Sequence, residues 1–261
     1  MALLRTTLLL FSAQLRRLLL SKRMLICSLL CMAPVGAAIL ISIVADAHED
    51  DVPAFELGWI LMIQGTVPLV ALILGSAVVA EEVEDRTVSY LFSRPIPRAS
   101  VLLGRWLATV VVLELLLFSS AEITFLLLQR GAGASEFALP AGMAAGMRNA
   151  CLIGGLVYSA LFAAGGAFLK HPMIVGIGYT FVVEGFLANL PGQNGSITIQ
   201  LHLKSYLAGL GPEVLARMEE LAGHQDLFAP EHALRRLAFV LVGALALGCW
   251  TVSRRQYLLA S

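Results

Sequence analysis

Six long runs of apolar residues constrain the fold of this chain more than any other feature of its sequence. The runs cover roughly residues 24–45, 57–80, 101–128, 150–169, 172–190 and 237–253. A helix needs roughly 20 apolar residues to cross a bilayer core of about 30 Å, so each run has about the length of one crossing. The composition agrees, since 58% of the residues are hydrophobic and only 14% are charged. We therefore predict an all-α polytopic membrane protein with six transmembrane helices.

The connections between these runs are short and leave little chain for a separate soluble domain. We therefore predict a single transmembrane domain over residues 1–261. The longest connection is the predicted outer loop 191–236, in which Gly211-Pro212 and Gly223 bound a short amphipathic helix. Two positions stay open for that helix, on the outer leaflet or over the exit of a pathway.

The distribution of cations predicts how the chain is oriented. With the N-terminus inside, 12 of the 18 Lys and Arg residues fall on inner segments and the other six on outer segments. Because Lys and Arg beside a span are retained in the cytoplasm, we predict a multi-pass protein of the cell inner membrane with both termini cytoplasmic. The net charge of zero gives no reason to expect a nucleic acid partner.

Residues 1–23 are predicted to form an amphipathic helix that lies in the membrane interface. Leucine and phenylalanine recur at spacings of three and four from Leu4 to Leu19, whereas Arg5, Arg16 and Arg17 lie mostly off that stripe. Such a helix would rest on the cytoplasmic face with its cations toward the lipid headgroups. The alternative is that these residues simply extend the first span.

The most densely charged connection is 81–98, EEVEDRTVSYLFSRPIPR, between the second and third spans. Acidic residues at its start and Arg94 near its end suit a helix dipole, and Pro95 and Pro97 would stop the helix. We interpret it as a short cytoplasmic helix with an apolar face for burial. A solvated loop that merely anchors two spans is the competing interpretation.

The region around this connection, GSAVVAEEVEDRTVSYLFSRPIPRASVLLGRWLA at 75–108, resembles the signature of ABC type-2 (ABC-2) permeases. These are the membrane subunits of ATP-binding-cassette exporters. The matching positions come in the family's order, although Asp85-Arg86 stands where a glycine commonly precedes the threonine. They are Glu81, Glu82, Thr87, Leu91, Arg94, Pro95, Arg98, Gly104 and Arg105.

The resemblance implies a permease that forms a translocation pathway as a dimer and sits on a separate ATPase through residues 81–98. Its expected partners are two copies of an ABC ATPase and a second permease copy or a related permease, within the lipid bilayer. Consistent with a separate motor, the chain has no G-x-x-x-x-G-K-[ST] phosphate loop, so we expect no enzymatic activity of its own. The expected coupling residues are Glu81, Glu82, Thr87, Leu91, Phe92, Arg94 and Arg98; for Arg98 and Arg105, headgroup anchoring is an equal alternative.

Three carboxylates lie inside predicted spans, namely Glu114, Glu122 and Glu184. Intramembrane acids are costly and normally face a bundle interior or a wet cavity, so each is a candidate pathway residue. The alternative for each is a structural glutamate that holds two helices together. We expect no cofactor and no metal site, because the four cysteines fall in spans without metal-ligand spacing.

A second functional class stays open beside the exporter subunit. The chain could be a stand-alone secondary carrier that uses its intramembrane glutamates, or a membrane scaffold. The transported substrate cannot be read from the sequence.

Overall fold

The computed structural model describes residues 2–48, 54–84, 98–132, 142–186, 197–223 and 226–254, and these form helices and short turns without a strand. In chain order the helices are α1 (Ala2–Leu19), α2 (Lys22–His48), α3 (Ala54–Gly58), η1 (Trp59–Thr66), α4 (Val67–Glu84), α6 (Arg98–Ala132), α7 (Met143–Phe168), α8 (Pro172–Gly178), η2 (Tyr179–Phe186), α9 (Ile199–Ala208), α10 (Pro212–Ala222) and α11 (Pro230–Arg254). The elements η1 and η2 are π-helices. The predicted all-α fold is confirmed.

Five segments of the described chain are long and apolar enough to cross a membrane. They are Lys22–Ile43, Phe55–Val78, Ala99–Arg130, Met143–Phe168 and Pro230–Arg254. The fifth predicted run is a shorter apolar segment, Pro172–Phe186, made of α8 and η2. At about 1.5 Å per residue this segment is shorter than a bilayer core, and the rest of the predicted run lies outside the described residues.

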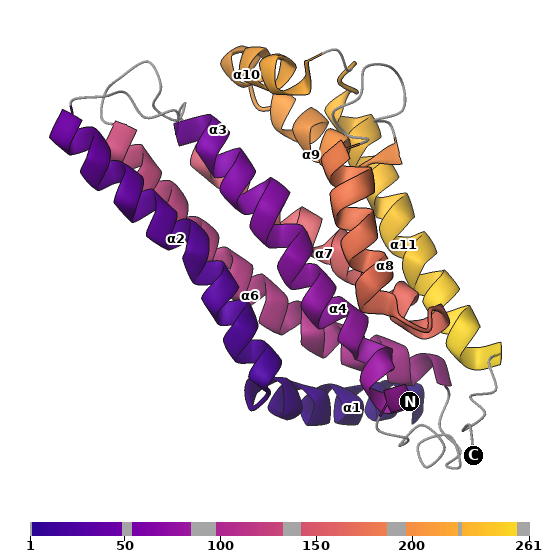
Figure 1. The fold of residues 1–261 in the computed structure, drawn as a ribbon. Helices are drawn as coiled ribbons and strands as arrows, with labels where there is room; N and C mark the ends of the chain where they lie inside the picture. Colours follow the sequence, from indigo (N-terminus) through magenta and orange to yellow (C-terminus); the bar gives the residue numbers. More distant parts are fainter. Residues whose placement is uncertain are drawn as a thin grey trace.

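The helices form a bundle with two distinct ends (Figure 1). We call the end that holds α1, the last turn of α4 and the first turn of α6 the lower end. The upper end holds α9 and α10. The start of α2 and the end of α11 both lie at the lower end, as an even number of passages through the bundle requires.

The helix α1 runs across the lower end, and the chain bends sharply between α1 and α2 (Figure 1). Ser21 makes the bend, because its hydroxyl donates to the Leu18 carbonyl at 2.8 Å and accepts from the Met24 N–H at 3.2 Å. The first turn of α2 is therefore capped by a serine side chain. Arg16 and Arg17 are exposed and Leu18 is buried. The residues before α2 therefore form a separate helix, as predicted, and do not extend the first span.

The helices α4 and α7 pack closely at the centre of the bundle. A Cβ placed on Gly75 would lie 2.9 Å from the Ser159 carbonyl oxygen, and one on Gly166 would lie 2.6 Å from the Ser76 carbonyl oxygen. Both contacts are with backbone, so a glycine is required at each position for this approach. In contrast, α2 and α11 expose many large apolar side chains, such as Leu29 at 75% and Phe239 at 79%.

The upper end contains two short helices. The helix α10 confirms the predicted amphipathic segment, since Pro212 lies in its first turn and Gly223, with a φ of 63°, ends it. The helix α9 was not predicted. It is buried on nearly all sides, although it carries Gln200, His202 and Lys204.

Candidate functional site

The predicted coupling segment 81–98 joins the lower ends of α4 and α6. Glu81 and Glu82 belong to the end of α4, which continues to Glu84 instead of giving way to a new helix at residue 81. Arg98 is the first residue of α6. The other predicted coupling residues, Thr87, Leu91, Phe92 and Arg94, lie outside the described residues.

Arg105 ties the two helices that flank this segment. Its side chain is 8% exposed, and its Nη1 lies 3.5 Å from the Val78 carbonyl oxygen of α4. Its burial favours a contact between helices over anchoring to lipid headgroups. Arg105 instead connects the first turns of α6 to the last turns of α4.

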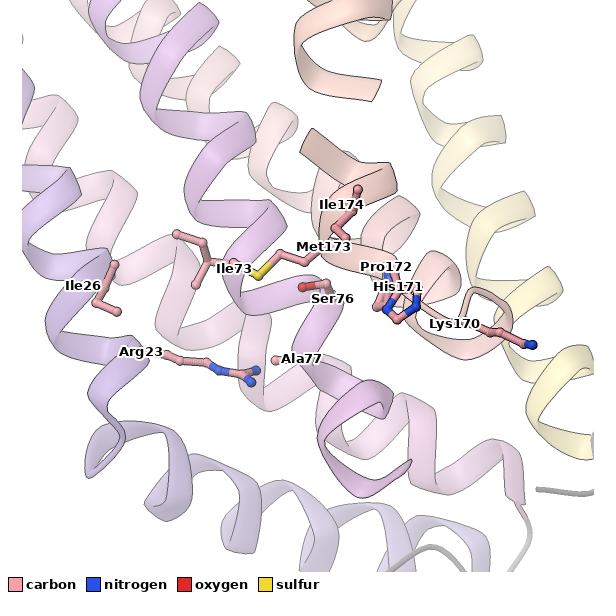
Figure 2. Close-up of a pocket in the computed structure, with 10 residues that line it drawn as sticks. All are labelled: Arg23, Ile26, Ile73, Ser76, Ala77, Lys170, His171, Pro172, Met173 and Ile174. Atoms are coloured by element: carbon pink, nitrogen blue, oxygen red, sulfur yellow. The ribbon is translucent and has the colours of Figure 1, made fainter. Parts of the chain in front are cut away.

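A pocket of about 280 Å³ opens at the lower end between α2, α4 and the turn from α7 to α8. Figure 2 shows Arg23 of α2 pointing toward Ala77 of α4. His171, in the turn from α7 to α8, lies on the side of the pocket opposite Arg23. Ile73 and Met173 line the part of the pocket above Arg23. The pocket therefore combines basic side chains with apolar walls.

Glu114 lies in α6 against the glycine-containing face of α7. A Cβ on Gly155 would lie 3.0 Å from Glu114 Oε1, so the missing side chain of Gly155 leaves room for the carboxyl group. Both carboxyl oxygens are buried and have no hydrogen-bond partner in the described part of the chain. An unpartnered buried acid is unusual in a folded protein, and Glu114 stays a candidate pathway residue.

Glu122 is paired with a cation. Its Oε2 lies 2.7 Å from Arg148 Nη1, which links α6 to α7, and the Arg148 guanidinium lies 5.4 Å from the centre of the Phe118 ring. This is the helix-linking arrangement that the structural alternative describes.

Glu184 caps the buried helix α9. Its carboxylate accepts hydrogen bonds from the Ile199 N–H at 2.9 Å, the Gln200 N–H at 3.1 Å and the Tyr179 hydroxyl at 2.8 Å. The first N–H groups of a helix have no partner within the helix, and a carboxylate there also complements the helix dipole. Glu184 therefore holds η2 to the start of α9, which again fits the structural alternative.

The other polar groups of α9 are also engaged. Lys204 Nζ donates to the Leu221 carbonyl of α10 at 2.8 Å and lies 5.7 Å from the centre of the Trp59 ring of η1. Burial lowers the pKa of Lys204 below its usual value. Ser205 accepts from the Phe228 N–H at 3.1 Å. The helix α9 is thus fixed by both π-helices and by α10.

His202 is the exception within α9. Its Nδ1 lies 2.7 Å from the Thr198 carbonyl oxygen, so Nδ1 carries a hydrogen and donates. The other ring nitrogen, Nε2, is buried and has no partner among the described residues. The ring stacks on Phe228 at a centroid distance of 5.4 Å.

Sequence reasoning missed the α9 cluster, although a local signal was present. Thr198 precedes the helix and its hydroxyl accepts from the Leu201 N–H at 3.3 Å, which is an N-cap arrangement. The partners of the helix come from η1, η2 and α10, and α9 also packs against α7 and α11, so all of them lie outside residues 199–208. Its burial could therefore not be read from residues 199–208 alone.

The family is decided by comparison with known proteins. The chain matches the model of the family described as ABC-2 family transporter protein over residues 10–201. It belongs to this family. No curated protein matches the chain. The resemblance seen at residues 75–108 is confirmed, and the match extends far beyond that motif.

The ABC-2 permease is thus a multi-pass membrane protein and the membrane subunit of an ABC-type transporter, not itself the ATPase. The match covers α2, α4, α6 and α7, which carry the lower pocket and the ends of the coupling segment. It stops within α9, so His202, Lys204 and all of α10 and α11 lie beyond it.

Proposed function

We propose that this ABC-2 permease forms the membrane pathway of an exporter as a dimer and is moved by a separate ATPase bound at residues 81–98. The observation that carries the proposal is that the end of α4 and the start of α6, which flank the segment, lie together at the lower end, where the buried Arg105 of α6 lies 3.5 Å from the Val78 carbonyl oxygen of α4. A partner that pushes on the segment would act on both helices at once.

The packing of α4 supports transmission of such a push into the membrane. Its Gly75 and Ser76 contact the backbone of α7 and Gly166, respectively, without room for a side chain between the helices. Tightly packed helices move as rigid bodies rather than deforming continuously. Movement of α4 would therefore be passed to α7.

The charges at the two ends support a cytoplasmic lower end. Arg16, Arg17, Lys22, Arg23 and Lys170 lie on elements at the lower end. The upper elements also carry cations, but Lys204 and Arg217 there are engaged by a carbonyl and by Glu56. Retention of basic residues inside the cell supports cytoplasmic termini and an inner-membrane location.

The proposed assembly contains two ATPase subunits and two permease copies, the second being identical or related. The exposed apolar faces of α2 and α11 suit contact with lipid or with a second copy. Copurification of two differently tagged copies from mixed membranes tests the homodimer. Recovery of one tag alone would leave a related permease as the partner.

The first test of coupling is retention of the ATPase by a tagged permease. Glu82→Ala and Arg94→Ala should lower ATPase recovery and transport together. Glu220→Ala and Arg235→Ala are matched controls, because both residues are exposed on upper-end helices, and they should have no effect. Unchanged transport in both segment variants would overturn the proposal.

The second test is sidedness. A cysteine at Thr87 should resist a membrane-impermeant thiol reagent in intact cells and react after permeabilisation, whereas one at Glu220 should react in intact cells. Cys27, Cys31 and Cys151 are buried and Cys249 is partly buried, so a Cys249→Ala background suffices. Labelling of the Thr87 position in intact cells would place the segment on the wrong side.

One observation favours a secondary carrier as the second candidate. Glu114 is a buried acid with unpartnered oxygens on the central helix α6. If the chain carries protons, transport should follow a proton gradient without any ATPase and be lost in Glu114→Gln. Transport that requires the ATPase would exclude this candidate.

A further inference from the structure

The lower pocket has two kinds of wall that point to an amphiphilic ligand. On one side lies the half-buried Arg23 of α2, and on the other lies the turn with Lys170 and His171, both exposed. In Figure 2 the guanidinium of Arg23 points into the space between α2 and α4, whereas the Lys170 amine points outward at the rim. The pocket mouth is therefore basic.

The rest of the pocket is apolar apart from Ser76, and several of its apolar side chains are exposed on the surface of the bundle. Ile26 of α2 is 54% exposed, and Met173 and Ile174 of α8 are 48% and 70% exposed. These residues belong to the first turns of membrane segments, so hydrocarbon chains of lipid can reach them directly. A purely water-soluble anion would make no contact with these apolar side chains.

The depth of the site is set by its place on α2. Arg23 follows Lys22, the first residue of the first candidate span, and Ile26 is one turn further into the membrane. This is the level at which lipid headgroups give way to acyl chains. A phosphate beside Arg23 would therefore leave its glycerol and chains level with Ile26 and Ile73.

We propose that this pocket binds one anionic phospholipid of the surrounding bilayer, with its phosphate between Arg23 and His171 and an acyl chain along Ile26, Ile73 and Met173. Arg23 supplies a planar guanidinium that can donate two hydrogen bonds to phosphate oxygens. His171 can donate a further one. Basic pockets between membrane helices on the cytoplasmic side are suited to such headgroups.

The site would connect lipid composition to transport, and in this respect it extends the proposed function. Ser76 and Ala77 of the pocket lie on α4, one to two turns before Glu81 and Glu82. A bound lipid would thus bridge α2, α4 and the α7–α8 turn at the base of the coupling segment. Lipid binding itself is measured without the ATPase, so its outcome is independent of the coupling proposal.

The test uses the purified full chain in detergent, with dioctanoyl phosphatidylglycerol, dioctanoyl phosphatidylcholine and inorganic phosphate as probes. Native mass spectrometry and thermal stability report binding. The expected result is binding of phosphatidylglycerol in clear preference to phosphatidylcholine, with no effect of inorganic phosphate at millimolar concentration.

Variants then locate the site. Arg23→Gln should weaken phosphatidylglycerol binding at least about tenfold, since a charge-assisted hydrogen bond to phosphate is lost. Lys22→Gln is the matched control, because it removes the same charge from the neighbouring exposed position and should change binding less than about twofold. Arg23→Lys keeps the charge but not the planar guanidinium, so its affinity for phosphatidylglycerol should lie between those of Arg23→Gln and Lys22→Gln. The unliganded melting temperature of each variant verifies that it is folded.

Four outcomes would overturn the proposal. Equal binding of the two lipids would show that charge is not recognised, and equal loss in the Arg23 and Lys22 variants would place the effect outside the pocket. Protection by inorganic phosphate alone would reveal an anion site without a lipid. An amphiphile that copurifies, displaces phosphatidylglycerol and is released on ATP hydrolysis by the partner would make the pocket a cargo site instead.

Discussion

The two ends of the bundle are held together by different physical interactions. At the upper end, buried polar groups of α9 are satisfied by Glu184, Leu221 and Phe228, which come from three other parts of the chain. Toward the lower end, Gly166 of α7 packs against the Ser76 carbonyl of α4, and cations such as Arg16, Arg17, Lys22 and Lys170 lie at exposed positions. Buried polar networks specify one arrangement, whereas glycine contacts and surface charge leave the pocket mouth open to ligands.

This contrast indicates how the two ends would divide the work of a transporter. A buried polar network resists partial opening, because each broken hydrogen bond leaves a buried group without a partner, although His202 Nε2 of α9 already has none among the described residues. The upper end is therefore the stiffer of the two. The lower end is the better place to receive a push from a partner or a lipid.

The strongest way to break the comparison is to remove the cap of α9. Glu184→Ala leaves two backbone N–H groups and the Tyr179 hydroxyl without their acceptor, which should destabilise the protein by about 3 kcal/mol or more. Thermal unfolding in detergent measures the loss, and limited proteolysis should show faster cleavage near 197–212. Glu220→Ala removes an exposed carboxylate and should stay within about 0.5 kcal/mol. Equal stability of the two variants would contradict the role of Glu184.

At the lower end the corresponding change is to fill the contact between α4 and α7. Gly166→Ala brings a Cβ to 2.6 Å from the Ser76 carbonyl oxygen and should destabilise the protein by about 1–3 kcal/mol. The neighbouring Gly165→Ala meets only the Leu169 side chain at 3.6 Å. It should therefore be neutral or stabilising by about 0.5–1 kcal/mol. Comparable melting temperatures for both variants would show that the helices can separate at no cost.

The sequence predicted the lower end better than the upper end, for a physical reason. The first helix and the lengths of the long spans depend on local patterns of apolar and charged residues. The role of Glu184 depends on its contact with the N–H of Ile199, 15 residues later in the chain, and no local pattern encodes that contact. The sequence also does not predict which faces of α2 and α11 point outward, because a helix that is apolar all round does not show which side contacts protein.

A smaller effect is expected from the cap that separates α1 from α2. Ser21→Ala removes both the acceptor for the Met24 N–H and the donor to the Leu18 carbonyl. The loss should cost about 1 kcal/mol, and Ser21→Asp, which retains an acceptor, should recover part of it. Thermal unfolding measures the cost. Because the change lies beside Arg23, the same variants also test whether the angle of α1 affects lipid binding in the pocket.

The smallest expected effect is a change of stability with pH that comes from the upper end. Burial lowers the pKa of His202 below its usual 6.5, and Arg236 acts in the same direction, against the hydrogen bond to Thr198. The unfolded chain therefore binds the proton first, so the stabilising contribution is complete above about pH 6.5 and is lost as the pH falls toward the folded pKa. Thermal stability should decline between pH 7 and pH 5, and His202→Phe, which keeps a ring against Phe228, should flatten that decline. Since a single group titrates, the change should be less than that of the Glu184 variant. If stability declines equally in His202→Phe, the acid sensitivity does not come from His202 in α9. The response to pH would then not distinguish the upper end from the lower end.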